Sequence, residues 1–206
     1  MKERGMIFNA EMVRAILDGR KTQTRRPVKF PVLDKNLGCE LAGNELAGEL
    51  SAGNYLNSAF GKPGDRIWVR ETWQAIHDYC DENGHVDERR YARSIPRHRG
   101  NYWHPVYEEA WGNESREDRE FPWRPSIHMP RWASRILLEI TGVRVERLRS
   151  MSQDDARAEG VIAASGPMEA GLAFRELWDS IYGEESWKAN PWVWVIEFKR
   201  VEGGAA

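Results

Sequence analysis

The segment Gly19-Arg20-Lys21-Thr22-Gln23-Thr24-Arg25-Arg26-Pro27 brings a primary amine, hydroxyl groups and fixed positive charges together in one short stretch. It follows residues 10–18, where apolar side chains recur on one helical face: Met12, Val13, Ile16 and Leu17. We expect a helix over residues 10–18, with Asn9 as its N-cap and Gly19 at its end. Such a helix would hold Lys21 and Thr24 on a rigid support.

Lys21 and Thr24 combine an amine with a hydroxyl beside positive charge, which suits binding a polar or anionic ligand or attacking a carbonyl group. A basic surface loop without a chemical role is the alternative, because Lys, Thr and Arg are common on protein surfaces. The two residues are an odd number apart, so in a regular strand their side chains would point to opposite faces. Convergence of the two side chains therefore requires a bend or bulge in this segment.

The composition indicates one intracellular domain. The chain has 206 residues, 41% of them hydrophobic, and a net charge of −2, so a nucleic-acid site would have to be a local basic patch. The N-terminus has no apolar signal-peptide core and no apolar run approaches ~18 residues, so we expect a cytoplasmic protein without a membrane partner. Cys39 and Cys80 match no zinc or disulfide spacing, and GxGxxG, Walker A, HExxH and CxxC motifs are absent, so we expect no metal and no cofactor.

Further elements are predicted from apolar periodicity and turn signals. In order they are a strand at 6–8, a strand over 66–74 after the turn Pro63-Gly64-Asp65, a strand or bent pair over 136–145 around Gly142, a helix from Ser152 to Gly160, a helix over 167–182 and a strand over 192–199. Residues 29–62 and 78–120 are predicted as two long loop insertions. Because the strands do not alternate regularly with crossover helices, we expect an α+β fold, a small mixed or antiparallel barrel with flanking helices, in a single domain over residues 1–206.

Glu159 lies in the last turn of the helix that Gly160 ends, where the helix dipole disfavours a negative charge. A carboxyl group so placed is a candidate proton donor or acceptor. An exposed glutamate that the helix merely tolerates is the alternative.

The second insertion and the segment after it hold candidate ligand-binding residues. One half of the insertion is basic and aromatic, with Arg89, Arg90, Tyr91, Arg93, Arg97, His98, Arg99, Tyr102 and Trp103, and the other half is acidic, with Glu108, Glu109, Glu114, Glu117, Asp118 and Glu120. The basic half can hold a nucleic-acid backbone, whereas the alternative is a solvated loop whose halves neutralise each other. Three prolines in residues 121–132 predict a stiff loop that presents His128, Arg131 and Trp132. His128 is a candidate base or a structural histidine, and Trp132 either stacks on a substrate ring or packs in the core.

Several segments of this chain resemble an ASCH domain of the PUA-like superfamily. They are Gly19-Arg20-Lys21-Thr22-Gln23-Thr24-Arg25-Arg26, Pro63-Gly64-Asp65-Arg66-Ile67-Trp68-Val69-Arg70-Glu71, the stretch from Ser152 to Gly160, and Val195-Ile196-Glu197-Phe198. The run from Ile127 to Arg135 and the ending Asn190-Pro191-Trp192-Val193-Trp194 resemble larger ASCH proteins, often encoded by phages and prophages. The resemblance covers about residues 5–28, 61–76 and 124–201. It implies a five- or six-stranded barrel with helices and a cleft suited to RNA or a nucleobase, while the two long insertions and the ten tryptophans depart from the small members.

The resemblance also implies an activity. Small bacterial ASCH proteins include N(4)-acetylcytidine amidohydrolases, whose catalytic Lys, Thr and Glu match Lys21, Thr24 and Glu159. The implied enzyme is a metal-independent amidohydrolase in which Thr24 attacks the acyl carbonyl, Lys21 takes the hydroxyl proton and Glu159 protonates the leaving nitrogen. Lys21 would have to be desolvated, because a free lysine is protonated at pH 7.

The implied partner is an acylated cytidine nucleoside or RNA. The residues expected to bind it are Arg25, Arg26, Glu71, His128, Arg131 and Trp132. Two alternatives stay open: a module that binds RNA or modified nucleic acid without chemistry, and a phage accessory protein that kept the fold but not the activity. The sequence does not indicate an oligomeric state.

Overall fold

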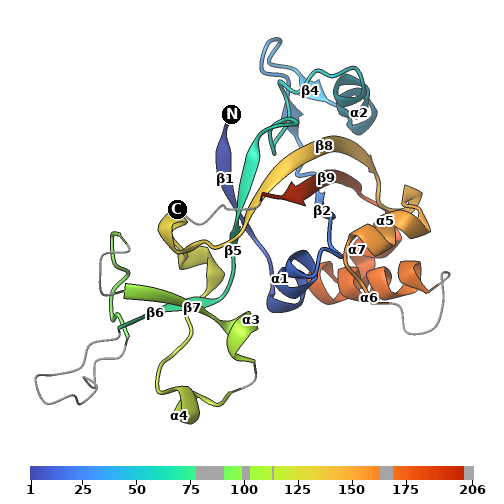
Figure 1. Ribbon diagram of the computed structural model, residues 1–206. Coiled ribbons are helices and arrows are strands. Elements are labelled where there is room, and N and C mark those ends of the chain that lie inside the picture. The colour runs from blue at the N-terminus through green and yellow to red at the C-terminus, as the bar shows by residue number, and fades with distance from the viewer. Residues whose placement is uncertain (78–90, 99–102, 113, 163–168, 202–206) are drawn as a thin grey trace, which may run out of the picture. The chain divides into compact units, whose positions relative to one another are not determined.

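The computed structural model describes residues 1–77, 91–98, 103–112, 114–162 and 169–201 (Figure 1). The strands are β1 (Glu3–Ile7), β2 (Gln23–Pro27), β3 (Val32–Leu33), β4 (Glu40–Leu41), β5 (Arg66–Arg70), β6 (Trp73–His77), β7 (Trp103–Tyr107), β8 (Leu137–Arg147) and β9 (Trp192–Arg200). The α-helices are α1 (Ala10–Leu17), α2 (Gly43–Ser51), α3 (Glu108–Trp111), α4 (Arg116–Arg119), α5 (Gln153–Ala158), α6 (Ala170–Tyr182) and α7 (Glu184–Ala189). The predicted α+β class is confirmed.

The strands form one five-stranded sheet in the order β1-β5-β8-β9-β2 and two hairpins, β3–β4 and β6–β7. None of these sheets is closed within the residues that the structure describes, so the barrel stays a prediction. Among the described helices, none has the length and apolar character that crossing a bilayer requires.

The described residues group into two compact units. The first unit contains residues 1–3, 15–66 and 138–201, and the second contains residues 4–14 and 67–137. The chain enters each unit more than once, so neither corresponds to a continuous stretch of sequence. This grouping does not test the prediction of a single domain.

In the first unit, β9 lies between β8 and β2 and is antiparallel to both. The β2–β9 register runs from Gln23 opposite Glu197 to Pro27 opposite Val193. Of the two predicted alternatives, β8 is the single long strand, and its register with β9 shifts between Ile140 and Gly142. A Cβ atom at Gly142 would lie 2.8 Å from Glu197 Oε2, so the Glu197 side chain on β9 covers this glycine.

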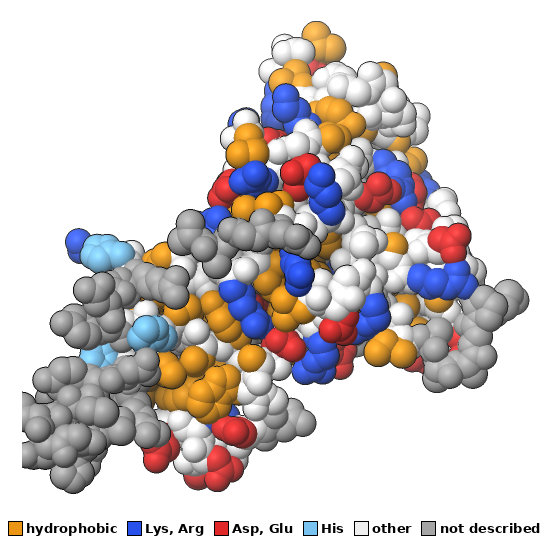
Figure 2. All heavy atoms as spheres, viewed as in Figure 1, with side chains coloured by type: hydrophobic (Ala, Val, Ile, Leu, Met, Phe, Trp, Pro, Cys, Tyr) orange, Lys and Arg blue, Asp and Glu red, His pale blue; other side chains and the backbone are white. Residues whose placement is uncertain are grey.

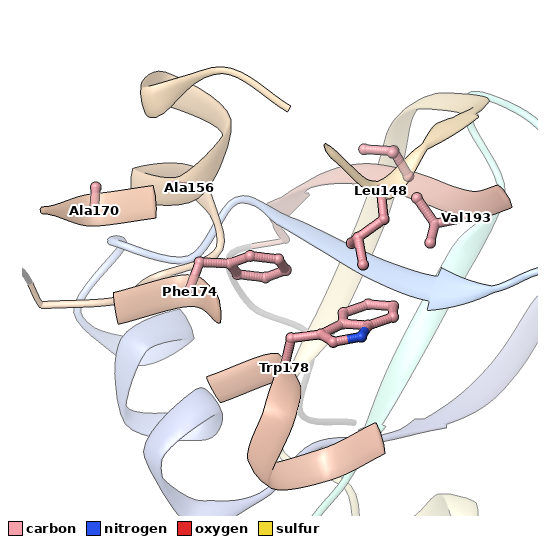
Figure 3. Packing of buried hydrophobic residues seen from close by; sticks show 7 residues of the cluster. Leu148, Ala156, Ala170, Phe174, Trp178 and Val193 are labelled. Carbon is pink, nitrogen blue, oxygen red and sulfur yellow. The ribbon is translucent and has the colours of Figure 1, made fainter. Parts of the chain in front are cut away.

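The core of the first unit lies between the helices α5 and α6 and the strands β8 and β9. Its buried members are Leu148, Ala156, Ala170, Phe174, Trp178, Val193 and Val195. Figure 3 shows Phe174 and Trp178, one turn apart on α6, pointing toward Leu148 and Val193. Burying each such large side chain contributes about 1.5–3 kcal/mol. This packing holds α5 against the strands, and α5, α6 and α7 gather together in Figure 1.

The first insertion is more regular than predicted. Residues 29–62 contain the β3–β4 hairpin and the helix α2. Leu46 and Leu50 are one helical turn apart and buried, and the Glu45 carboxylate accepts a hydrogen bond from the Ala42 backbone at the start of α2. The prediction of an irregular segment was therefore wrong, because a single buried turn of leucines is too short to show a clear period.

Other boundaries also differ from the prediction. The strand expected over residues 66–74 is divided between β5 and β6, with the buried Glu71 between them. The helix expected over 167–182 is observed from residue 170 onward, and its predicted start lies outside the described residues. In the second insertion, Arg89, Arg90, Arg99 and Tyr102 also lie outside them.

Candidate functional site

Lys21 lies between α1 and β2, where the sequence predicted a candidate amine. Gly19 ends α1 with a φ of 75°, as expected for a glycine after a helix. The Lys21 backbone N–H then donates to Ala15 O at 2.9 Å, and Lys21 forms an isolated bridge with Glu159. The Lys21 side chain is 0% exposed.

The Lys21 amine and the Glu159 carboxyl group are in direct contact. Lys21 Nζ donates to Glu159 Oε2 at 2.8 Å and to Glu159 O at 2.9 Å. Glu159 is the C-cap residue of α5 and is followed by Gly160, which has a φ of 85°. A Cβ atom at Gly160 would lie 2.8 Å from Lys21 Cβ, so only glycine lets the two segments approach this closely.

Arg25 holds the other oxygen of Glu159. Arg25 Nη1 donates to Glu159 Oε1 at 3.1 Å, and Nη2 donates to Glu146 Oε1 at 2.8 Å. Asp155 Oδ1 lies 3.4 Å from Nη2. Arg25 was predicted to bind substrate, but its side chain is fully buried and its terminal nitrogens contact carboxylates of this chain.

Thr24 belongs to β2, as Arg25 does, but its side chain lies on the opposite face of the strand. Lys21, Gln23 and Arg25 all contact residues of the α5 segment, and Gln23 Nε2 donates to Asp155 O at 2.8 Å. Thr24 pairs with Ile196, and the β2–β9 register contains no shift. Because side chains alternate along a strand, Thr24 points to the face opposite Gln23 and Arg25.

The bend that would bring Thr24 toward Lys21 is therefore not present in β2. The Thr24 residue is buried, with 1% of its surface exposed. Lys21 and Glu159 are brought together, whereas Thr24, three residues after Lys21, has its side chain on the other face.

Arg144 extends the ion network behind Arg25. Arg144 Nε contacts Glu146 Oε2 at 3.0 Å, Nη2 contacts Asp155 Oδ1 at 2.8 Å, and Nη1 contacts Glu197. Sequence reasoning missed this network. The available signals were the i, i+2 spacing of Arg144 and Glu146, which puts both on one face of β8, and the capping box of Asp155 with Ser152.

The surroundings of Lys21 favour its neutral amine. Burial lowers the pKa of Lys21 from its ordinary value, the Glu159 carboxylate opposes this shift, and the charges of Arg26 and Arg25 lower it further. A lysine that acts as a base near neutral pH needs this desolvation.

Asp155 stays charged beside this pair. Partial burial alone would raise the pKa of Asp155, but hydrogen bonds from Ser152 and Gln23 and the charge of Arg25 hold it well below its usual range. Ser152 Oγ also accepts from the Asp155 backbone N–H at 3.0 Å, which confirms the predicted cap of α5.

Arg26 also belongs to β2 and is half-buried. Its Nη1 lies 3.5 Å from the Tyr182 hydroxyl on α6. Its predicted role in substrate binding stays a prediction.

Four other predicted binding residues, Glu71, His128, Arg131 and Trp132, belong to the second unit. Glu71 is buried and accepts from Arg135 Nε at 3.0 Å and from Arg135 Nη2 at 2.9 Å. Burial raises the pKa of Glu71, and the paired Arg135 opposes that shift.

Trp132 is partly buried and packs against the core of the second unit, where the sequence left core packing or stacking on a substrate ring as alternatives. Its ring meets Trp73 edge to face at 5.6 Å, and its Nε1 donates to Pro96 O at 3.0 Å. His128 and Arg131 are exposed, in or beside short 3₁₀ turns.

Within the described residues, no group of three or more His, Cys, Asp and Glu side chains is arranged to hold a metal ion. No model of a known protein family, no curated protein and no solved structure matches this chain. The arrangement of Lys21, Arg25 and Glu159 therefore has to be interpreted from its own geometry. It provides a buried amine and a buried carboxyl group that can exchange a proton directly.

Proposed function

We propose that this chain is a metal-independent amidohydrolase that removes the acyl group from the exocyclic amine of N(4)-acylcytidine-type nucleosides. The contact between Lys21 Nζ and Glu159 Oε2 at 2.8 Å carries the proposal, because a base and an acid for amide hydrolysis meet there. The resemblance of this chain to ASCH domains supplies the proposed substrate class. It also implies a closed PUA-like barrel. Both remain part of the proposal.

In the proposed first step, Lys21 is neutral and Glu159 is protonated. Thr24 Oγ1 attacks the acyl carbonyl carbon, and its proton moves to Lys21 Nζ. The tetrahedral intermediate collapses with cleavage of the carbon–nitrogen bond, and Glu159 gives its proton to the leaving amine. Cytidine departs, and the acyl group remains as an ester on Thr24.

The Lys21–Glu159 contact then resets the site. The proton on Lys21 passes to Glu159 along their hydrogen bond, which restores a neutral amine and a protonated carboxyl group. Water attacks the ester carbonyl and gives a proton to Lys21, while Thr24 leaves and takes the proton of Glu159. A second transfer between the pair completes the cycle, and the free carboxylic acid departs.

The burial of Lys21 matters to the rate. An ordinary lysine has a pKa of about 10.4, so making it neutral at pH 7 costs roughly 4–5 kcal/mol. Desolvation and the neighbouring arginines reduce that cost. An exposed lysine in a surface ion pair would gain no such advantage.

The position of Thr24 sets a condition on this mechanism. Its side chain leaves β2 on the face opposite Arg25, so attack requires Thr24 Oγ1 and Lys21 Nζ to approach each other in the substrate complex. If they do not, a water molecule activated by Lys21 is the nucleophile.

RNA binding without chemistry is less well supported. The cations of the 20–26 segment are already engaged: Arg20 with Asp18 and Gly160 O, Lys21 with Glu159, Arg25 with Glu159 and Glu146, and Arg26 with Tyr182. On the face that Figure 2 shows, Lys and Arg side chains stand among Asp and Glu side chains. Phosphate recognition needs positive charge that is not already neutralised, and carboxylates neutralise Arg20, Lys21 and Arg25 in this segment.

The test follows the loss of long-wavelength absorbance when the protein is incubated with N(4)-acetylcytidine. We expect turnover that falls by roughly 10²–10⁴-fold in Lys21→Ala, Thr24→Ala and Glu159→Gln. Lys199→Ala, an exposed lysine paired with Glu139, is the control and should keep full activity.

Each other outcome has a separate meaning. Folded wild-type protein without turnover overturns the proposal, and salt-sensitive RNA binding in that case supports the binding module. Full activity in Thr24→Ala would refute Thr24 as the nucleophile. Lys21 and Glu159 would keep their roles as base and acid, and water would be the nucleophile.

A further inference from the structure

Both oxygens of the Glu159 carboxyl group are held by side-chain nitrogens from one short segment. Lys21 Nζ contacts Oε2 at 2.8 Å, and Arg25 Nη1 contacts Oε1 at 3.1 Å. A carboxyl group held at one oxygen can rotate about its last bond, whereas one held at both oxygens has a fixed plane. Arg25 therefore sets the direction in which Glu159 presents Oε2 to Lys21.

Arg25 also contacts two carboxylates other than Glu159. Its Nη2 contacts Glu146 at 2.8 Å and Asp155 at 3.4 Å, and these two carboxylates also bind Arg144. The Phe174 ring lies 5.9 Å from the Arg25 guanidinium carbon. These contacts occupy both terminal nitrogens of the guanidinium group with carboxylates of this chain.

The burial of Arg25 is not explained by its own hydrogen bonds. Its Nε is buried and has no partner among the described residues. Leaving a buried donor unpaired reduces stability. A residue kept in such a position at a cost to folding is more readily explained by a role in a site than by packing.

We propose that Arg25 is a positioning residue that orients Glu159 for proton exchange with Lys21, rather than a residue that binds substrate. The proposal rests on the proposed hydrolase function. It also predicts a charge effect on Lys21, which faces Glu159 from the α5 end and Arg25 and Arg26 from β2. Removing the Arg25 charge should raise the pKa of Lys21.

The decisive comparison is Arg25→Met against Arg144→Met. Both variants remove one arginine from the same network, but only Arg25 contacts Glu159. We expect Arg25→Met to lower kcat roughly tenfold to a hundredfold with KM within about twofold, and Arg144→Met to lower kcat less than about threefold. A substrate-binding role would instead raise KM.

The pH profile and a conservative variant sharpen the test. In Arg25→Met the rise of kcat with pH should move to higher pH. The raised pKa keeps Lys21 protonated, and therefore inactive as a base, up to a higher pH. Arg25→Lys keeps the charge but not the forked geometry, so kcat should fall while the pH profile stays in place. If Arg25→Met does not fold, Arg25→Lys alone decides, since unchanged kcat in that variant would overturn the positioning role.

A measurement without turnover separates this inference from the proposed function. The chain has seven lysines, so the ¹³Cε signals of labelled lysine can be resolved and Lys21 assigned with Lys21→Met. We expect the Lys21 signal to titrate at higher pH in Arg25→Met than in wild type and in Arg144→Met. Identical titrations in all three would refute the role of Arg25, whether or not wild type hydrolyses acylcytidine.

Discussion

At the residue scale, the main feature is a lysine that is completely buried yet paired with a carboxyl group. Two charges removed from water lose hydration, and their attraction recovers only part of it unless the geometry is good. Lys21 Nζ has two acceptors, both on Glu159, and burial shifts its pKa downward. The neutral form is therefore reached more easily at Lys21 than at a surface lysine.

The lowered pKa of Lys21 predicts that the stability of the protein depends on pH. Because the pKa of Lys21 is lowered in the folded state, the unfolded chain binds more protons between that lowered value and about 10.4. The free energy of unfolding should therefore rise with pH across this window relative to Lys21→Met, which lacks the group. Urea denaturation of both proteins between about pH 7 and pH 10 measures the difference.

Lys199→Met serves as the control, because the Lys199 side chain is 64% exposed. The difference between wild type and Lys199→Met should not change with pH in the same way. A wild-type curve parallel to that of Lys21→Met would contradict the buried, shifted amine.

At the element scale, the end of α5 and the start of β2 are brought together through a glycine. Gly160 has a positive φ, and the space beside its Cα is taken by Lys21 and Ala15. The helix dipole argument from the sequence named Glu159 as a candidate acid, and the structure places it at the C-cap of α5 in contact with Lys21. The contact itself depends on how closely two backbones approach, and no helix signal describes that.

Gly160→Ala should disturb this approach. Its added Cβ would meet Lys21 Cβ and Ala15 Cβ at 2.8 Å, in addition to the strain of a positive φ. We expect a loss of about 2–4 kcal/mol in the free energy of unfolding, together with loss of turnover, because Lys21 is displaced.

Gly53→Ala is a matched control, since Gly53, which follows α2, has a φ of 78° and nothing within 4 Å of its added Cβ. That variant should lose only about 1 kcal/mol and keep its activity. Equal losses in the two variants, measured by urea denaturation, would show that backbone strain alone accounts for Gly160.

At the scale of the whole molecule, the site depends on segments that are far apart in the chain. Lys21 and Glu159 are separated by 138 positions and meet because both lie in the first unit, whose core joins α5, α6 and the strands. The aromatic residues of α6 supply much of that core (Figure 3). Weakening the core should therefore affect the site as well as stability.

Phe174→Ala tests this dependence. Phe174 is 3% exposed, so the variant should lose about 3–5 kcal/mol of stability and with it the ordered contact between Lys21 and Glu159. Leu172→Ala on the same helix is the control, because Leu172 is 61% exposed and should change stability by less than about 0.5 kcal/mol. A small effect of Phe174→Ala in thermal or urea unfolding would contradict the core described here.

The sequence alone determined the elements whose signals are local. The helix α1 and its glycine end, the capped helix α5 and the last strand β9 follow from spacing and capping within a few residues. Lys21 and Glu159 were selected by residue type, by place in an element and by resemblance. The odd spacing of Lys21 and Thr24 also warned that a regular strand would separate them, and β2 is regular.

Only the tertiary structure decided the rest. It brought Lys21 and Glu159 into contact, placed Arg25 inside a network with Glu146 and Asp155, and packed Trp132 against a core. It also gave residues 29–62 a hairpin and a helix. The physical reason is range: propensity and capping act over one or two turns of chain, whereas an ion pair between distant segments exists only after packing has brought them together.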